Sequence, residues 1–163
     1  MKIVKGDLLS RAYAGEFDVI VHGCNCFCTM GAGIALAIKN LFPEAYEADC
    51  DTAYGDRAKL GTFSEAYITM GTRSLTVVNA YTQYHFKGPG PNVDYDAIAK
   101  VFRAIKAAFP GARIGYPMIG AGLAGGDWER IAKIIDTELA GEDHTLVVFE
   151  AQKAQPPAQG TLL

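Results

Sequence analysis

The sequence predicts an α/β fold in which helices cover both faces of a largely parallel sheet. Two observations support this prediction. Apolar, strand-like segments alternate along the chain with segments of helical periodicity. The expected strand 17–22 also contains the continuous apolar run Val19–Val21, which is typical of a strand that is buried on both of its faces in a parallel sheet.

Six apolar or β-branched runs between turn residues are expected to be strands, namely 2–5, 17–22, 62–69, 75–81, 112–116 and 144–150. Helices are expected at 31–41 and 43–54, from the cap Asp94 to before Pro110, and from the cap Asp127 onward. Segment 8–15 is expected to be a loop or a short helix. The predicted buried positions on these helices are Ile34, Ile38, Leu41, Ile98, Val101, Phe102, Ile105, Trp128, Ile131, Ile135 and Leu139.

The composition indicates one domain without a general electrostatic surface for nucleic acids or membranes. The chain has 163 residues and a net charge of −3, and its apolar runs are too short to span a bilayer. We expect a domain over 1–150 and a loosely ordered tail over 151–163. The first residues have the pattern of a strand, not of a signal peptide. We therefore expect a monomer in the cytoplasm.

One histidine and three cysteines occupy every second position of the segment His22–Cys28. A zinc site usually needs a second, distant pair of ligands, and the sequence has none. An alternating set is also an unusual framework for disulfides. We therefore expect reduced, buried cysteines, no metal site and no cofactor.

Two glycine-rich turns each lie between a strand and a helix, at 31–33 and 120–126. Glycine lets a ligand approach the backbone, and the first N–H groups of a helix bind anions. Together the two turns predict a cradle for a diphosphate. The second turn also matches GxGxxG, but too little chain follows for a dinucleotide fold, and a plain structural loop is the other alternative.

Four side chains near these turns have both a structural and a functional interpretation. Asn25 either bonds its own turn or binds a sugar hydroxyl, and Asp7 is a turn residue or a ligand contact. His22, at the expected strand end, is a buried structural group or a general acid or nucleophile near a phosphate. Phe149 belongs to the core or stacks on a base or sugar.

Four segments together resemble the macrodomain, the module that binds ADP-ribose. They are Val4–Leu9, the strand Val19–Val21 leading to Asn25, Gly31–Ala35, and Pro117–Leu123. The resemblance implies a three-layer α/β/α fold with a central, mixed, mostly parallel six-stranded sheet. It also implies that Asp7 and Phe149 contact the adenine, that Asn25 faces the distal ribose, and that the glycine loops wrap the diphosphate. The ADP-ribose contacts expected on this basis are Asp7, Leu8, Thr29, Met30, Gly31, Ala32, Gly33, Ile34, Ile119, Gly120, Ala121, Gly122, Leu123, Ala124 and Phe149.

Two positions distinguish branches of this family. In the branch that removes ADP-ribose through a lysine adduct, a lysine and an aspartate stand where this chain has Gln83 and Ala124. The segment around His22 is instead similar to ADP-ribose 1″-phosphate phosphatases and to small phage macrodomains. The resemblance thus implies hydrolysis of ADP-ribose 1″-phosphate, with His22, Asn25 and His85 as candidate catalytic groups. The alternatives are a non-catalytic ADP-ribose reader and a hydrolase of O-acetyl-ADP-ribose or ADP-ribosyl-protein esters.

Overall fold

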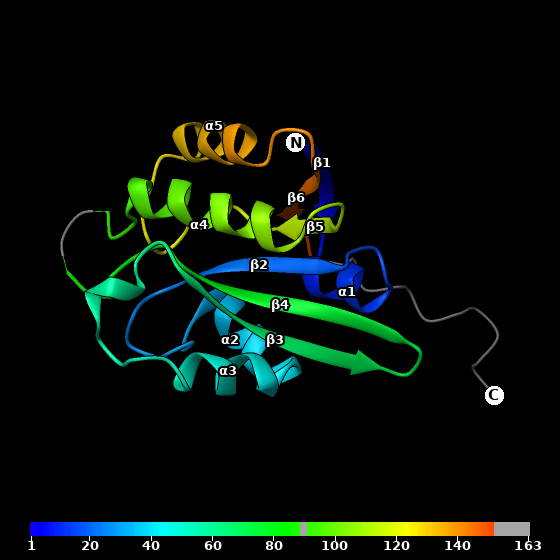
Figure 1. Cartoon of the computed structure of the whole chain (residues 1–163), viewed down its shortest axis with the longest axis horizontal. Coiled ribbons are helices and arrows are strands. Elements are labelled where there is room, and N and C mark those ends of the chain that lie inside the picture. Colours follow the sequence, from blue (N-terminus) through cyan, green and yellow to red (C-terminus); the bar gives the residue numbers. More distant parts are fainter. Residues whose placement is uncertain (89–90, 152–163) are drawn as a thin grey trace, which may run out of the picture.

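A six-stranded sheet in the order β1-β6-β5-β2-β4-β3 forms the centre of the computed structural model, which describes residues 1–88 and 91–151 (Figure 1). Five strands are parallel, and only β3 runs antiparallel, against β4. The predicted mixed, mostly parallel sheet is confirmed. Its strands are β1 (Lys2–Gly6), β2 (Val19–Cys24), β3 (Phe63–Met70), β4 (Arg73–Tyr81), β5 (Arg113–Tyr116) and β6 (Asp143–Phe149).

Helices cover both faces of this sheet and complete three layers (Figure 1). One face carries α1 (Leu8–Tyr13), α2 (Gly33–Leu41) and α3 (Pro43–Cys50), and the other carries α4 (Tyr95–Ala108) and α5 (Trp128–Glu138). A 3₁₀ turn, η1 (Arg57–Lys59), follows α3. The expected caps of α4 and α5 are confirmed, because Asp94 and Asp127 each accept a hydrogen bond from a backbone N–H of the first turn.

Strand β2 lies between β5 and β4 and contributes to both cores. Val19 and Val21 point toward α4 and α5, whereas Ile20 and Cys24 point toward α2 and α3. This alternation follows from the two-residue period of a strand. The continuous apolar run that predicted burial on both faces is therefore explained, and β2 carries its carboxyl end to the middle of one sheet edge.

Several element boundaries differ from the expected ones. Strand β2 begins at Val19 and continues to Cys24, two residues past the expected end. Helix α3 ends at Cys50 and not at Tyr54, because Asp51 already closes its last turn. Leu41, expected in the core, is 46% exposed. The expected tail lies outside the described residues from 152 onward.

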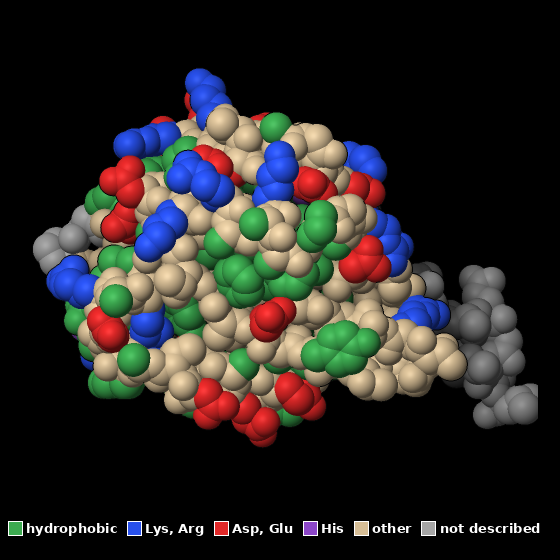
Figure 2. All heavy atoms as spheres, viewed as in Figure 1, with side chains coloured by type: hydrophobic (Ala, Val, Ile, Leu, Met, Phe, Trp, Pro, Cys, Tyr) green, Lys and Arg blue, Asp and Glu red, His purple; other side chains and the backbone are tan. Residues whose placement is uncertain are grey.

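The surface agrees with the small net charge of the chain. Basic and acidic side chains are interspersed over most of the face that Figure 2 shows. None of the described helices is long and apolar enough to cross a membrane.

Candidate functional site

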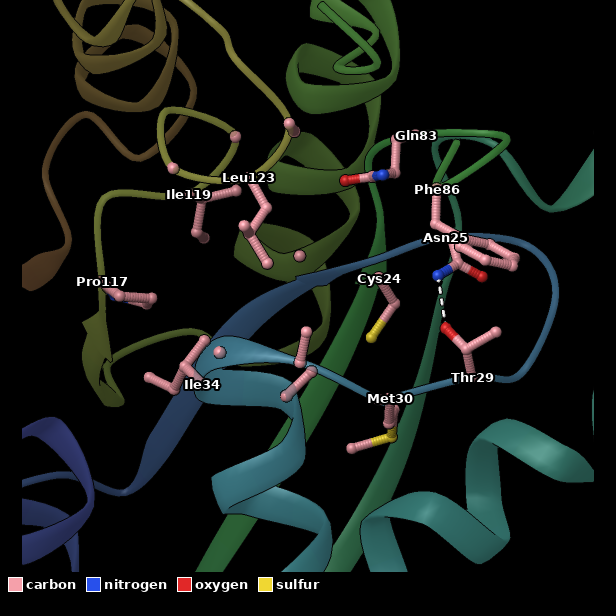
Figure 3. Close-up of a pocket in the computed structure, with 18 of the residues that line it drawn as sticks. Cys24, Asn25, Thr29, Met30, Ile34, Gln83, Phe86, Pro117, Ile119 and Leu123 are labelled. Carbon is pink, nitrogen blue, oxygen red and sulfur yellow. Dashed lines mark hydrogen bonds between the residues drawn. The ribbon is translucent and has the colours of Figure 1, made fainter. Parts of the chain in front are cut away.

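A pocket of about 490 Å³ opens where β2 ends, between the loops that follow β2 and β5 (Figure 3). Ligands of open α/β sheets bind at this edge, beyond the carboxyl ends of the strands. The volume is in the range of small-molecule sites. The lining residues are Gly23, Cys24, Asn25, Thr29, Met30, Gly31, Ala32, Gly33, Ile34, Ala35, Asp49, Gln83, Phe86, Pro117, Met118, Ile119, Gly120, Gly122, Leu123 and Ala124.

The first wall is the loop between β2 and α2. Asn25 Oδ1 accepts a hydrogen bond from Phe27 N at 2.8 Å, and Asn25 Nδ2 donates to Thr29 Oγ1 at 2.7 Å (Figure 3). Asn25 therefore makes the local bonds expected of a turn asparagine while it lines the pocket. In its bond to Asn25 the Thr29 hydroxyl is the acceptor, so its own proton is not used in that bond.

Helix α2 begins in this wall without a capping side chain. Its N-cap residue is Ala32, in extended conformation, and no side chain in the described chain bonds the first turn. Gly33, Ile34 and Ala35 form that turn and line the pocket. The unpaired N–H groups and the positive end of the helix dipole are thus available to an anion.

The opposite wall is the loop after β5, from Pro117 to Ala124. Within residues 1–88 and 91–151, no backbone acceptor is found for the N–H groups of Gly120, Gly122 and Leu123. A Cβ at Gly122 would meet no atom within 4 Å, so this residue borders open space. The loop can therefore present backbone donors to a ligand at close range.

Only one of the two helix starts faces the ligand space. The N-terminus of α5 is closed by its own cap, since Asp127 Oδ1 accepts from Glu129 N at 3.0 Å, and no residue of α5 lines the pocket. The cradle predicted from the two glycine turns therefore has a helix N-terminus on one side only. The second loop contributes through its own backbone.

Gln83 and Phe86 close a third side of the pocket. In Figure 3, Phe86 lies across the pocket from Leu123. Gln83 donates from Nε2 to the carbonyl of His85 at 2.8 Å. The imidazole of His85 stacks on Phe86 at 4.9 Å and does not line the pocket. Its predicted part in catalysis stays a prediction.

His22 is an interior residue of β2, and its expected position at the strand end is wrong. Its side chain is fully buried on the α2–α3 face, with Nε2 2.6 Å from Oδ1 of Asn79 on the neighbouring strand. Burial lowers the pKa of His22 to about 4, although the hydrogen bond to Asn79 opposes this shift. His22 does not line the pocket, so a direct catalytic role would require it to move.

The floor of the pocket contains a cysteine and a carboxyl group. Cys24 points its sulfur into the pocket (Figure 3), and burial raises the pKa of this thiol well above its ordinary value. Asp49, near the end of α3, is 1% exposed and accepts a hydrogen bond from the Tyr81 hydroxyl at 2.7 Å. Burial also raises the pKa of Asp49. Neither Cys24 nor Asp49 was among the expected ligand contacts.

Cys28 and Cys50 form a disulfide, which corrects the expectation of four reduced, buried cysteines. The alternation of cysteines would place them on one face only if the strand continued, but β2 ends at Cys24. Cys28 lies in the following loop with φ of 54° and reaches the end of α3. The bond therefore ties the first pocket wall to α3. Cys24 and Cys26 are free and buried.

Four of the expected ligand contacts lie outside the pocket. Asp7 caps α1 through Ser10 N at 3.0 Å, and Leu8 is buried in the core. Phe149 is 74% exposed at the end of β6, next to Gly6 in the strand register. Ala121 is half-buried beside the α4–α5 core. Asp7 and Phe149 share the pocket's edge of the sheet, and their contacts to adenine stay predictions.

The remaining expected contacts all line the pocket, namely Thr29, Met30, Gly31, Ala32, Gly33, Ile34, Ile119, Gly120, Gly122, Leu123 and Ala124. The pocket also contains residues outside the expected set, among them Cys24, Asp49 and Phe86. Asp49 is one of several acidic residues on α3, and no spacing singles it out. Phe86 is in a loop whose path the sequence does not define.

Comparison with known proteins supports one family. The model of the Macro domain matches residues 21–135. An uncharacterized 17.5 kDa protein of Enterobacteria phage T4 is 39% identical over 157 residues, which cover 92% of this chain and 97% of the phage protein. The DNA ADP-ribosyl glycohydrolase of Mycobacterium tuberculosis is 31% identical over 136 residues, 77% of this chain but only 35% of that protein.

A yeast enzyme and a solved structure extend this likeness. The ADP-ribose 1″-phosphate phosphatase of Candida albicans is 26% identical over 149 residues, 86% of this chain and 90% of the enzyme. The macrodomain of Thermus aquaticus DarG superimposes with a TM-score of 0.71 at 23% identity, covering 92% of this chain and 97% of that chain. This last match supports the fold alone. The chain belongs to the macrodomain family, whose members bind ADP-ribose or hydrolyse compounds that contain it.

Proposed function

We propose that this macrodomain binds ADP-ribose in the pocket and hydrolyses ADP-ribose 1″-phosphate to ADP-ribose and phosphate. The uncapped start of α2 carries the proposal. Its first-turn N–H groups line the pocket, and no side chain of the described residues caps them. Such a helix start binds phosphate groups.

The two loop walls supply further backbone donors around the same space. Gly120, Gly122 and Leu123 line the wall opposite α2, and their N–H groups have no backbone acceptor among the described residues. Donors fixed before a phosphoryl group reacts stabilise the charge on its oxygens in the transition state. They support a site for a diphosphate and for a terminal phosphate ester.

The side chains at two positions favour the phosphatase over an enzyme that uses a lysine adduct. Gln83 and Ala124 line the pocket and carry no charge. The resemblance described above implies a lysine and an aspartate at these places in the lysine-dependent branch. The yeast relative named as an ADP-ribose 1″-phosphate phosphatase covers most of the chain, which supports the same proposal.

Removal of ADP-ribose from DNA is a second candidate. The mycobacterial relative named as a DNA ADP-ribosyl glycohydrolase is more similar in sequence than the yeast phosphatase. This observation favours a glycohydrolase, whereas the uncharged Gln83 weighs against the lysine-dependent route. Both substrates therefore belong in the same experiment.

The test measures ADP-ribose affinity by calorimetry and product release from ADP-ribose 1″-phosphate and ADP-ribosylated DNA. The variant Gly122→Val adds a branched side chain where the structure has open pocket space, so we expect affinity and phosphate release to fall about tenfold or more. Ala37→Val, at an exposed position of α2 outside the pocket, is the matched control.

Each outcome has a distinct meaning. Phosphate release by the wild type and its loss in Gly122→Val support the proposal. Tight ADP-ribose binding without turnover of either substrate would show a reader. Release of ADP-ribose from DNA without phosphatase activity would show the glycohydrolase.

A further inference from the structure

Asp49 is the one carboxylate in the described part of the chain that lines the pocket. It lies at the second-last position of α3 and is 1% exposed. A carboxylate almost without solvent is costly unless it is paired or has a function. No sequence pattern accounts for Asp49, so its surroundings have to explain it.

One carboxyl oxygen of Asp49 is held firmly. Oδ1 accepts from the Tyr81 hydroxyl at 2.7 Å, and this hydroxyl is also 2.8 Å from Ser64 Oγ and 3.4 Å from Thr52 Oγ1. Tyr81 is itself buried at the end of β4, paired in register with Cys24. The Tyr81 bond therefore fixes the orientation of the carboxyl group.

The second oxygen is left open. Oδ2 accepts no hydrogen bond from residues 1–88 or 91–151. Every fully buried polar side-chain atom of these residues has a hydrogen-bond partner, so Oδ2 is not fully buried. Oδ2 thus keeps some access to open space, and the open space that Asp49 borders is the pocket. One oxygen is anchored and the other is free to meet a ligand.

The groups around Asp49 do not include a salt-bridge partner within the described chain. Lys59, from η1, donates from Nζ to the Cys26 carbonyl at 3.2 Å and lies 4.6 Å from the centre of the Tyr81 ring. The thiols of Cys24 and Cys26 are the other titratable groups nearby. Burial raises the pKa of Asp49, against the weaker opposing effects of Tyr81 and Lys59. A raised pKa is typical of a carboxyl group that donates a proton.

We propose that Asp49 is the general acid of the phosphatase reaction, a role that rests on the function proposed above. Water attacks the phosphorus atom while the bond between phosphorus and the 1″-oxygen breaks. Protonated Asp49 gives its proton to the departing 1″-oxygen, and the products are ADP-ribose and dihydrogen phosphate. Asp49 recovers its proton from dihydrogen phosphate, which leaves as hydrogen phosphate, so atoms and charge balance.

The other candidate acids are less suitable by position. His22 is fully buried and outside the lining, and His85 lies behind Phe86. Gln83 has no proton to give. Cys24 lines the pocket, but burial raises the pKa of its thiol well above the ordinary value, so it is a weaker proton donor than Asp49. Asp49 combines an acidic proton, a fixed orientation and contact with the pocket.

The experiment compares Asp49→Asn with Asp51→Asn in the full-length chain. Asn keeps the size of Asp and an oxygen for the Tyr81 hydroxyl, but it cannot donate an acidic proton. Asp51, two residues later and exposed, provides the same chemical change outside the pocket. We expect kcat for ADP-ribose 1″-phosphate to fall about 100-fold or more in Asp49→Asn. ADP-ribose affinity and melting temperature are expected to stay near wild type, and Asp51→Asn is expected to behave as wild type.

Tyr81→Phe provides a second readout that keeps the carboxyl group. The Tyr81 hydrogen bond lowers the pKa of Asp49, so its loss should extend activity to higher pH. An alkaline limb that stays at the wild-type pH would overturn the role of Asp49, as would an Asp49→Asn enzyme with wild-type kcat. In both cases the phosphatase itself would stand. A wild-type protein that binds ADP-ribose but releases no phosphate would overturn the proposed function and the role of Asp49 together.

Discussion

The imidazole of His22 is fully buried, with Asn79 Oδ1 at 2.6 Å and the Cys24 sulfur at 3.6 Å from Nε2. Asn79 is held in turn, because its Nδ2 donates to the Ala45 carbonyl at 2.9 Å and to Ser64 Oγ at 3.0 Å. A protonated ring in this place would lack solvent and a negative partner. His22 is therefore a neutral structural group that joins β2 to β4.

We expect the stability of the wild type to fall faster with acid than that of His22→Gln. The folded-state pKa of His22 is about 4 and the unfolded value is about 6.5. Between these values the unfolded chain binds one more proton than the folded chain. The contribution of neutral His22 to the free energy of unfolding is therefore fully present above pH 6.5 and is lost as the pH falls toward 4. Gln keeps a hydrogen-bond donor but does not titrate.

Urea unfolding at several pH values measures this effect. The advantage of the wild type over His22→Gln should shrink by about 2 kcal/mol between pH 7 and pH 5. ADP-ribose affinity should change little, because His22 does not line the pocket. A constant difference in stability between pH 7 and pH 5 would contradict the neutral, buried state of His22.

At the scale of elements, α2 begins without a capping side chain at the place where we propose that an anion binds. Ala32 occupies the N-cap with φ of −150° and ψ of 160°, the extended conformation that a capping side chain also uses. Alanine cannot accept a hydrogen bond from the first turn, so the helix lacks the stabilisation that Asp or Ser would add. This loss is reasonable if a ligand takes the place of the cap.

The variant Ala32→Asp should separate stability from binding. A capping carboxylate should raise the free energy of unfolding by about 1 kcal/mol, and its charge should lower ADP-ribose affinity about tenfold or more. Chemical denaturation and calorimetry measure the two effects. Ala32→Ser, which caps without charge, should lower affinity less. Equal affinities in wild type and Ala32→Asp would show that the anion binds elsewhere.

The Cys28–Cys50 disulfide joins two further elements, the first pocket wall and α3. It spans a sequence separation of 22 residues, and a loop of that length corresponds to about 3 kcal/mol of stability. We expect dithiothreitol to lower the thermal unfolding midpoint of the wild type. It should also weaken ADP-ribose binding, because the loop that forms the first pocket wall is then no longer bonded to α3. The double variant Cys28→Ser, Cys50→Ser is the control, and dithiothreitol should leave it unchanged. An unchanged wild type would mean that the bond does not stabilise the fold.

At the scale of the whole molecule, the pocket and the β3–β4 turn lie at opposite ends of the sheet. The turn Gly71–Thr72 joins antiparallel strands, and β4 then runs from Arg73 toward the pocket at Tyr81 (Figure 1). Both turn residues are exposed, and a Cβ at Gly71 would contact nothing within 4 Å. A short peptide inserted at this turn should leave ADP-ribose affinity within about twofold of wild type. The same insertion between Leu123 and Ala124 should abolish binding, and calorimetry measures both.

The fold was predictable because the periodic spacing of apolar residues in strands and helices is a local property of the sequence. All six strands, and the helices α2, α4 and α5, lie near their expected ranges. Helix α3 was expected to be too long, since no glycine or proline interrupts the sequence before Gly55. The structure ends α3 at Cys50, and Asp51 N closes the last turn on the carbonyl of Glu47.

The backbone part of the site was predictable for the same reason, because glycine turns between strands and helices have a local signature. The side-chain part was not. The role of His22 depended on whether β2 ended at residue 22 or at residue 24. Asp49 and Cys50 belong to an acid-rich helix whose position beneath the loop only the folded chain defines. Contacts across the core between distant segments decide which polar groups reach a ligand.

The disulfide also gives one pocket wall an unusual response to proteolysis. Lys39, on α2, is the one lysine or arginine between Cys28 and Cys50. A single tryptic cut after Lys39 would therefore leave the two fragments covalently joined, and they would separate only after reduction. The backbone can be broken inside this ring without loss of either half of the wall.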